Sequence, residues 1–535
     1  MPLTQSAGLT LDASRTAKLV EVGIALSAET NLEKLLEKII SYARELTLAD
    51  AGTLYTVNGG FLDFKIIQND TLGIRLGGPG SEPITLAPVP ITRSAVSGYA
   101  ALTGTLVNIP DVYESSDFDF TGPRRYDEKT GYRSRSMLVV PMHDHEGTII
   151  GVLQLLNCTD PAQKTVIPFP REVEPIASAF ASQAAISLTN AKLIKEVRDL
   201  FESLIRVMAT AVDAKSPYTG NHVQRVAKLN TLLAEEINAC GEGVFAGVHF
   251  TEDQMSEIRI SGWLHDVGKI TTPTWVMDKS TKLQTVFDRI ELVKSRFTAA
   301  VLEAEARALR AFGARVSGDG EKVEESPEMA RAKEETEALM ADYSFIESVN
   351  QPSEFMSDEM LAKLNDIYRR RSGVVSGGGP LLTAEETLNL SIRKGSLNEH
   401  EIALMRQHVV DTAKILAEVP FDKTGKLKNV PVYAAQHHEK LNGTGYPRGI
   451  AETDLPLQSR ILAVADFYEA LSAKDRPYKK PMPPEVIYRI MKSCGEHGEL
   501  DPKIVELLFE RGIHEKFEEL YEREKGAGRR STDGI

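Results

Sequence analysis

The chain is poor in cysteine: its 535 residues include only Cys158, Cys240 and Cys494, and no two of them form a CxxC pair. A disulfide framework needs several cysteines at short, regular spacing, so this sequence excludes one. We therefore expect free thiols and a reducing compartment.

Long apolar runs and excess positive charge are also missing. No stretch approaches the ~18 apolar residues that a membrane-spanning helix needs, and the N-terminus lacks a charged-then-apolar signal pattern. Lysine and arginine total 62 against 76 acidic residues, a net charge of −14. Because proteins that bind nucleic-acid polymers usually present a basic surface, we expect neither such a polymer nor a membrane as partner. The expected location is cytoplasmic.

What the chain does have is length and an ordinary globular composition. Its hydrophobic content is 42% and its charged content 26%. These values are typical of soluble globular proteins. A chain of this length predicts about two to four domains, each able to bury its own core.

One short stretch, Gly262–Lys269, contains a histidine directly followed by an aspartate. Adjacent residues at a helix end lie about 100° apart around the axis, so His265 and Asp266 could hold one cation from the same side. Gly268 suits a helix C-terminus, and Lys269 would lie just beyond the cation, where a phosphate oxygen would sit. An HD pair alone is common, so its significance depends on residues elsewhere.

Other histidines and an aspartate end or interrupt apolar helical runs. Burying an unpaired carboxylate such as Asp466 in an apolar run would be costly. Imidazole suits iron, manganese, zinc and similar metals, and carboxylates can bridge two of them. The full set is too large for one tetrahedral ion and suits two. The candidate metal ligands are His222, His265, Asp266, His408, His437, His438 and Asp466.

In chain order this set resembles the H…HD…D signature of HD-domain metal phosphohydrolases. His408, the His437–His438 pair and the segment Gly443–Pro447 resemble the additional HHE…GxGYP signature of the HD-GYP subfamily. The resemblance covers residues 200–282 and 396–510. It implies an all-α domain that hydrolyses cyclic di-GMP or a related cyclic dinucleotide to the linear dinucleotide.

The resemblance also implies two divalent metal ions. Iron or manganese is expected, and zinc, nickel and magnesium are the alternatives. Asp266 would bridge the ions, and Lys269 would act with it in catalysis by stabilising charge on the phosphate. Glu439 is expected to orient a ligand histidine. One ion would have His222, His265, Asp266 and Asp466, and the other His408, His437 and His438.

Two loops would contact the substrate, the GYP loop and the segment that resembles the family's DRPYK motif. The expected substrate contacts are Lys269, Tyr446, Arg476 and Lys479. The sequence departs from the family pattern at Tyr218, where three-metal members have Glu, so two ions are expected. Asn442 replaces a common Asp, and Glu469 replaces a frequent Asp and could be a weaker ligand.

The N-terminal part of the chain alternates between helical and strand patterns. Residues 14–48 read as one helix that Asn31 could interrupt. Short strands separated by Gly, Pro and Asp clusters follow, giving an α+β antiparallel sheet. The predicted strands are Gly52–Val57, Phe61–Ile67, Thr105–Ile109, Ser136–Pro141 and Ile149–Asn157.

The segments Asn108–Tyr113, Thr130–Pro141 and Gly151–Asn157 resemble a GAF domain, particularly those of cyclic-nucleotide phosphodiesterases and cyclases. The resemblance implies a cyclic nucleotide as ligand, with Asp111, Arg124, Arg133 and Arg135 on its phosphate side. Cys158 stands where the nucleotide-binding subset has Lys. The alternative is a GAF fold used for dimerisation or for another ligand.

From Glu172 to Ala214 apolar residues recur at steps of three and four, which predicts one long helix. Its exposed apolar stripe would need a partner, so we expect a parallel two-stranded coil that makes the protein a homodimer together with the GAF domain. The alternative is two ordinary helices that meet end to end.

The HD-type domain is interrupted, because Lys279–Leu283 and Lys394–Asn398 resemble the same family loop. The helical insertion between them could dimerise, cover the active site, dock a partner, or simply present solvated helix faces. The expected organisation is a GAF domain (1–171), a linker helix (172–214), the first part of the HD-GYP domain (215–282), the insertion (283–394) and the second part (395–535).

The function expected from this sequence is that of a metal-dependent cyclic-dinucleotide phosphodiesterase in bacterial second-messenger signalling, regulated by its GAF domain. Two alternatives remain. One is a receptor or interaction module that binds without turnover, and the other is an HD phosphohydrolase acting on a different phosphoester.

Overall fold

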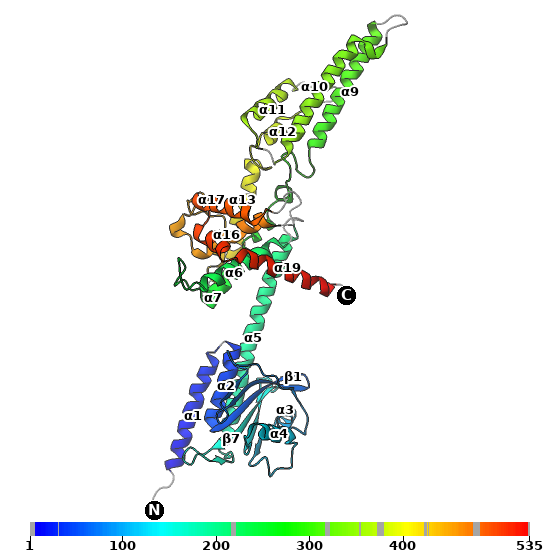
Figure 1. Cartoon of the computed structure of the whole chain (residues 1–535). Coiled ribbons are helices and arrows are strands. Elements are labelled where there is room, and N and C mark those ends of the chain that lie inside the picture. Colours follow the sequence, from blue (N-terminus) through cyan, green and yellow to red (C-terminus); the bar gives the residue numbers. More distant parts are fainter. Residues whose placement is uncertain are drawn as a thin grey trace, which may run out of the picture. The chain divides into compact units, whose positions relative to one another are not determined.

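The computed structural model divides into two compact units, Met1–Phe201 and Glu202–Ile535 (Figure 1). The residues that it describes are 6–29, 31–215, 221–315, 322–352, 355–371, 379–421, 425, 427–473 and 482–532.

The first unit is built on an antiparallel sheet of order β3-β2-β1-β7-β6-β5, in which β4 pairs with β2 and β8 with β7. The strands are β1 (Ala49–Asn58), β2 (Phe61–Asn69), β3 (Ile74–Leu76), β4 (Val89–Pro90), β5 (Val107–Ile109), β6 (Met137–His143), β7 (Ile149–Thr159) and β8 (Val166–Ile167). The α+β antiparallel fold predicted from the sequence is confirmed. The strands β3, β4 and β8, of two or three residues each, were not predicted.

Apolar side chains fill both faces of this sheet. Strand β6 is buried along nearly its whole length, and alternate side chains enter different cores. Leu138 and Val140 join the core beneath the long helices, whereas Met137 and Val139 join the core on the opposite face. The helices of this unit are α1 (Ser6–Ser27), α2 (Leu32–Thr47), α3 (Val96–Thr103), α4 (Thr121–Thr130) and the start of α5 (Val173–Asp213).

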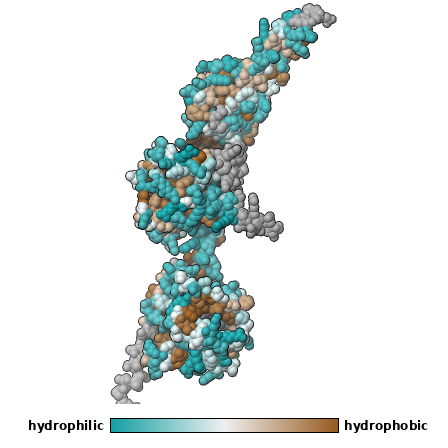
Figure 2. Space-filling model, viewed as in Figure 1, coloured by the Kyte–Doolittle hydropathy of each residue, from teal (hydrophilic) through white to brown (hydrophobic). Residues whose placement is uncertain are grey.

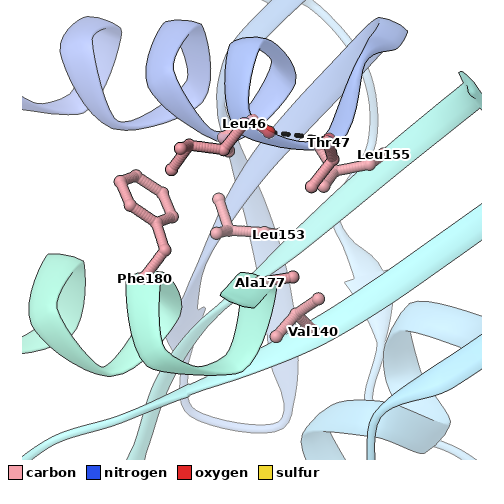
Figure 3. Close-up of a pocket in the computed structure, with 8 residues that line it drawn as sticks. Leu46, Thr47, Val140, Leu153, Leu155, Ala177 and Phe180 are labelled. Atoms are coloured by element: carbon pink, nitrogen blue, oxygen red, sulfur yellow. Dashed lines mark hydrogen bonds between the residues drawn. The ribbon is translucent and has the colours of Figure 1, made fainter. Parts of the chain in front are cut away.

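Close packing leaves no water-sized cavity where α2 and α5 meet the sheet (Figure 3). Leu46 of α2, Leu153 of β7 and Phe180 of α5 point toward one another there. The one hydroxyl at this place, that of Thr47, donates to the Ala43 carbonyl at 2.7 Å. This interior is therefore a packed core.

The helix expected over residues 14–48 is two helices, α1 and α2. Asn31 has extended backbone angles, and its side-chain oxygen accepts a hydrogen bond from the Lys34 amide at 3.1 Å. Such an N-cap starts a new helix because it satisfies an amide that has no partner within the helix. The possible interruption at Asn31 is thus a complete break.

The second unit is helical. Its core joins α6, α7, α16, α17, α18 and α19. The helices outside the insertion are α6 (His222–Asn238), α7 (Glu252–Leu264), η1 (Val267–Ile270), α8 (Thr274–Met277), α13 (Glu399–Ala417), α15 (Val430–Ala435), η3 (Glu452–Asp454), α16 (Leu457–Ser472), α17 (Pro484–Glu496), α18 (Pro502–Glu510) and α19 (Ile513–Thr532).

The insertion has an apolar core of its own, in which the rings of Phe297 and Tyr343 lie 5.9 Å apart. Its helices are α9 (Ile290–Arg315), η2 (Val323–Glu325), α10 (Pro327–Asn350), α11 (Asp358–Arg370) and α12 (Ala384–Leu390). In Figure 1 α9 and α10 run side by side.

The chain leaves for the insertion and returns from it at one place. Lys279, which precedes the insertion, forms a buried ion pair with Glu401 of α13, at 2.7 and 2.8 Å to the two carboxylate oxygens. The Ser396 hydroxyl donates to the Lys279 carbonyl at 2.8 Å. These contacts close the base of the insertion, so α13 can begin without distortion although more than a hundred residues separate it from the HD pair.

Candidate metal centre

All the predicted metal ligands lie together in the second unit, although separate helices carry them. His222 is the first residue of α6, and His265 ends α7 immediately before Asp266 and η1. His408 belongs to α13 and Asp466 to α16, while His437 and His438 follow α15. Helix ends and turns therefore supply most of the set.

Asp266 lies at the middle of the set, and its two carboxylate oxygens face different histidines. Its Oδ2 is 3.3 Å from Nε2 of His222 and 3.3 Å from Nε2 of His265. Its Oδ1 is 3.4 Å from Nε2 of His408 and 3.9 Å from Nε2 of His437. One carboxylate thus separates the histidines into two groups.

Potential ligand atoms also gather in threes, each trio within 4.8 Å. Nε2 of His222 is 3.3 Å from Oδ1 of Asp466, which places this second carboxylate on the His222 side. The trios are His222, His265 and Asp466; His265, Asp266 and His437; and His408, His437 and His438.

Hydrogen bonds at Nδ1 set the tautomer of most of these histidines. His265 donates from Nδ1 to the Gly262 carbonyl at 2.7 Å, and His437 donates to that of Ala434 at 2.7 Å. His408 makes the same kind of bond to the Met405 carbonyl at 2.5 Å. With the proton on Nδ1, the lone pair on Nε2 points into the cluster, which is the state in which imidazole binds a metal.

Several buried polar atoms at this point lack a hydrogen-bond partner among the described residues. They are Oδ1 of Asp266 and Nε2 of His265, His408 and His437. Leaving a buried polar atom unpaired costs about 1–3 kcal/mol, so four converging ones need a common partner. All four are electron-pair donors, so a divalent cation fits them and an anion does not.

Burial keeps three of the histidines neutral. It lowers the pKa of His408, holds that of His437 well below its usual range, and lowers that of His438 to about 4. These imidazoles therefore need no deprotonation at neutral pH before they bind a cation.

The carboxylates are kept ionised against the effect of burial. Burial opposes ionisation of Asp266, yet the Lys269 ammonium holds its pKa well below the usual range. Nζ of Lys269 lies 2.5 Å from Oδ2 of Asp266. Burial likewise opposes ionisation of Asp466, and contacts with His222 lower its pKa. The cluster offers fixed negative charge where a cation would bind.

Gly268 has a different role from the predicted one. It lies inside η1 and does not have positive φ, so it does not end a helix there. A Cβ at this position would lie 2.0 Å from the His408 carbonyl oxygen. The Gly268 amide also donates to the Thr412 hydroxyl at 2.9 Å. Glycine is required because α13 passes directly against η1, which brings His408 next to Asp266.

Glu469 supports a ligand from outside the cluster. Its carboxylate bonds to Nδ1 of His222 and accepts a hydrogen bond from Nε of Arg225 at 3.2 Å. Burial opposes protonation of His222, but this neighbouring carboxylate raises the pKa of His222 well above its usual value. Glu469 therefore has the geometry of a residue that orients a ligand and increases its basicity.

Glu439 does not orient a histidine. Its two carboxylate oxygens accept hydrogen bonds from the amides of Arg448 and Ile450, at 2.8 and 2.9 Å. These bonds hold the loop that carries Tyr446, whose peptide bond to Pro447 is cis. The expectation was wrong because adjacency in the sequence does not show which side a carboxylate faces after a turn.

Tyr446 lies beside the cluster, with its ring 4.8 Å from that of His438. Arg406 of α13 covers the same ring, its guanidinium carbon 5.0 Å from the ring centre. Arg406 was not predicted, and its only signal in the sequence was its position two residues before His408. The pair forms an aromatic and cationic border next to the histidines.

The remaining predicted substrate contacts, Arg476 and Lys479, lie outside the described residues, as does Tyr218. In the first unit, the predicted phosphate-side residues surround Tyr113. Arg124 and Arg133 lie over its ring, 5.4 and 4.7 Å from the centre.

Two more of these first-unit residues pair with each other. Nε of Arg135 donates to Asp111 at 3.1 Å. Arg124 belongs to α4 and the other three lie in the segments before and after it, and the described contacts engage all four with the protein itself.

Across the part of the chain that is described, no helix combines the length and apolar character needed to cross a membrane.

Residues 31–188 match the GAF domain family, and residues 354–504 match an HD domain family. The HD match includes His408, His437, His438 and Asp466, while His222, His265 and Asp266 precede it. The 3′3′-cGAMP-specific phosphodiesterase 2 of Vibrio cholerae is 35% identical over 156 residues, which cover 28% of this chain and 29% of that protein.

The cyclic di-GMP phosphodiesterase of Thermotoga maritima is 33% identical over 135 residues, or 25% of this chain and 34% of that protein. The chain thus spans about a third of the length of these relatives. The solved GAF domain of an Acinetobacter phosphoenolpyruvate-protein phosphotransferase aligns with 34% of this chain and 98% of its own length, at 14% identity and a TM-score of 0.26. The chain carries an N-terminal GAF domain and, after it, a domain of the HD family.

Proposed function

We propose that this protein is a metal-dependent phosphodiesterase that hydrolyses cyclic di-GMP, or a related cyclic dinucleotide such as 3′3′-cGAMP, to the linear dinucleotide. The observation that carries the proposal is Asp266, whose two oxygens face two groups of buried histidines. A carboxylate in that position suits a bridge between two cations. The activities named for the similar curated proteins support the choice of substrate class.

The proposed centre holds two divalent ions, iron or manganese, with zinc, nickel or magnesium as alternatives. When bound, such ions supply Lewis acidity toward phosphoryl oxygens and make a water molecule more acidic. The proposed ligands of one ion are His222, His265, Asp266 and Asp466, and those of the other are Asp266, His408, His437 and His438.

The chain's own residues would perform the other tasks. Lys269, held 2.5 Å from Asp266, would place its positive charge beside the reacting phosphate. Tyr446 and Arg406 would bind the dinucleotide next to His438, by stacking on a base and by pairing with a phosphate. Arg476 and Lys479 are proposed as further substrate contacts from the sequence resemblance.

An assay with defined substrates tests this function. The full chain, loaded with Mn²⁺ or anaerobically with Fe²⁺, is incubated with cyclic di-GMP and with 3′3′-cGAMP, and the products are separated by chromatography. We expect linear dinucleotide from at least one substrate and none after chelation of the metal. Binding of both substrates without product would instead support a receptor without turnover. Hydrolysis of other phosphoesters alone would support a different HD phosphohydrolase.

We further infer that the protein is a homodimer through helix α5. Its exposed apolar residues follow a heptad pattern, and Val197 and Leu200 are 66% and 61% exposed. An asparagine among apolar seam positions is typical of two-stranded parallel coils, because it favours one register. The seam positions are Ile186, Asn190, Leu193, Val197, Leu200, Leu204 and Val207.

Sedimentation of the full chain tests the dimer. The wild type should sediment as a dimer, and Val197→Glu should yield monomer because it places like charges at the centre of the seam. Lys195→Glu, on the same helix but outside the seam, is the matched control and should remain dimeric. A monomeric wild type would contradict this inference and support two separate helices.

The GAF domain is proposed to regulate the enzyme, with a cyclic nucleotide as its ligand and Asp111, Arg124, Arg133 and Arg135 near the phosphate. The cluster of arginines around Tyr113 supports an anionic ligand. Calorimetric titration with cyclic AMP and cyclic GMP tests it. If neither binds, the GAF domain would serve dimerisation or another ligand.

A further inference from the structure

The last residue of α5 and the turn that follows it contact two separate segments of the candidate metal centre. Within the second unit, this end of the helix is anchored by Ile205, Ala209 and Val212, which are all buried. Their spacing of four and three residues places them on one face of the helix. The helix therefore has a fixed position where its last residue, Asp213, and Lys215, two residues after its end, meet the metal centre.

Lys215 binds the backbone of the segment that contains Asp266 and Lys269. Its ammonium donates to three backbone carbonyls, those of Lys269 at 3.1 Å, Ile270 at 2.5 Å and Thr272 at 2.6 Å. These carbonyls lie at or just after the C-terminal end of η1, where carbonyl groups lack partners within the helix. A cation placed there is favourable for both charge and hydrogen bonding.

Asp213 binds the backbone of the segment that begins with His222. Its buried carboxylate accepts a hydrogen bond from the Val223 amide at 3.3 Å. Helix α6 needs this acceptor, because its own N-cap residue Asn221 has positive φ and makes no side-chain capping bond. A carboxylate at the positive end of a helix also stabilises it electrostatically.

We propose that Asp213 and Lys215 are positioning residues, through which the end of α5 holds the His222 segment and the Asp266–Lys269 segment in their relative places. This rests on the proposed function for its consequence in catalysis. The same unbroken helix contributes Ala177, Phe180 and Ala184 to the core of the GAF-containing unit. Within the second unit, Asp213 and Lys215 therefore act on the metal ligands through the backbone segments that carry them.

Substitution of Lys215 tests the proposal. Lys215→Met keeps the aliphatic stem and removes the three hydrogen bonds. Calorimetric titration of the full chain with Mn²⁺ should show an affinity about 10–100-fold weaker, as is typical when support of a ligand is lost. Hydrogen exchange should accelerate in residues 266–272 and stay slow in residues 222–238.

Two further variants separate positioning from a general structural role. Lys215→Arg retains several donors and should restore most of the Mn²⁺ affinity. Lys195→Ala, a matched lysine on the exposed side of α5, should leave affinity and exchange unchanged. If Lys215→Met does not fold, Asp213→Ala, which removes the acceptor of the Val223 amide, is measured in the same way and should weaken Mn²⁺ binding by about 10–100-fold, and wild-type affinity in that variant would overturn the proposal.

Wild-type Mn²⁺ affinity and wild-type exchange in the Lys215→Met protein would overturn the proposal. So would equal damage by Lys215→Arg and Lys215→Met. These readouts need no turnover. An inactive wild type that still shows the expected losses of affinity would refute the proposed function and leave the positioning role standing.

Discussion

The two units differ in how their buried polar side chains are hydrogen-bonded. In the GAF-containing unit, buried Asp127 accepts hydrogen bonds from the Tyr113 hydroxyl at 2.8 Å and from the amide and hydroxyl of Ser134 at 2.8 and 2.9 Å. In the second unit, buried atoms of Asp266, His265, His408 and His437 converge without such partners. The first pattern is explained by folding alone, and the second is not.

Isolated unpaired atoms do occur in the first unit, for example Nε of Arg44 and Oδ1 of Asn108. They lie on different elements and do not gather at one point. What distinguishes the second unit is therefore the convergence of such atoms. Figure 2 colours both units with mixed polar and apolar surface, so hydropathy does not separate them.

The largest expected effect comes from Asp266. Asp266→Asn removes the charge that faces both histidine groups, so we expect loss of hydrolysis by more than about 1,000-fold and loss of bound metal. Metal content by mass spectrometry and product formation are measured together. A variant that keeps full metal content and activity would contradict the view that the converging unpaired atoms of the second unit form a metal site.

A core substitution in the first unit should lower the stability of that unit and leave Mn²⁺ binding unchanged. Phe180 is 1% exposed and packs between α2 and the sheet. Phe180→Ala should destabilise that unit by about 3–5 kcal/mol, because it leaves a cavity. Calorimetric unfolding of the full chain reports the loss, while Mn²⁺ affinity should equal that of the wild type. A coupled loss of Mn²⁺ affinity would show that the metal centre depends on that core.

Metal addition should stabilise only the second unit. At a free Mn²⁺ concentration 100 times the dissociation constant, its unfolding free energy should rise by about 2.7 kcal/mol, because the ion binds only the folded centre. The unfolding transition of the first unit should not move. Equal stabilisation of both transitions would mean that Mn²⁺ binds outside the cluster as well.

The smallest expected effect concerns Glu469. Glu469→Gln removes the charge beside Nδ1 of His222, so Mn²⁺ affinity should fall by about 10–100-fold while the fold is kept. Glu506→Gln, an exposed acid on α18, is the matched control. Wild-type affinity in Glu469→Gln would mean that the packing around His222 suffices to hold it without the Glu469 charge.

Local patterns in the sequence predicted much of the fold. Alternating apolar residues predicted the longer strands, and steps of three and four predicted α5, because these periods are properties of the backbone itself. They did not show that Asn31 separates two helices, since an N-cap and a helix interior differ by the backbone angles of one residue.

The candidate ligands were predicted from the order of His and Asp residues along the chain. The structure added the neighbouring residues that hold these ligands in place. Glu469, Lys215 and Arg406 act on the cluster from outside. The sequence marked Glu469 only as a possible weaker ligand and Arg406 only by its position two residues before His408, and nothing in the local sequence distinguishes Lys215 from a surface charge. Glu439 and Gly268 were correctly predicted to lie next to the cluster, but the roles predicted for them were wrong. Only packing showed that Gly268 makes room for α13.

The sequence by itself determined which side chains can hold a cation, because ligand chemistry belongs to the residue types of His and Asp. It also predicts an insertion into one domain, since the flanking loop occurs twice. Only the tertiary structure decided that Asp266 stands between two histidine groups and that α5 ends on the segments carrying them. Such arrangements depend on contacts between residues up to about 250 positions apart, which no local pattern encodes.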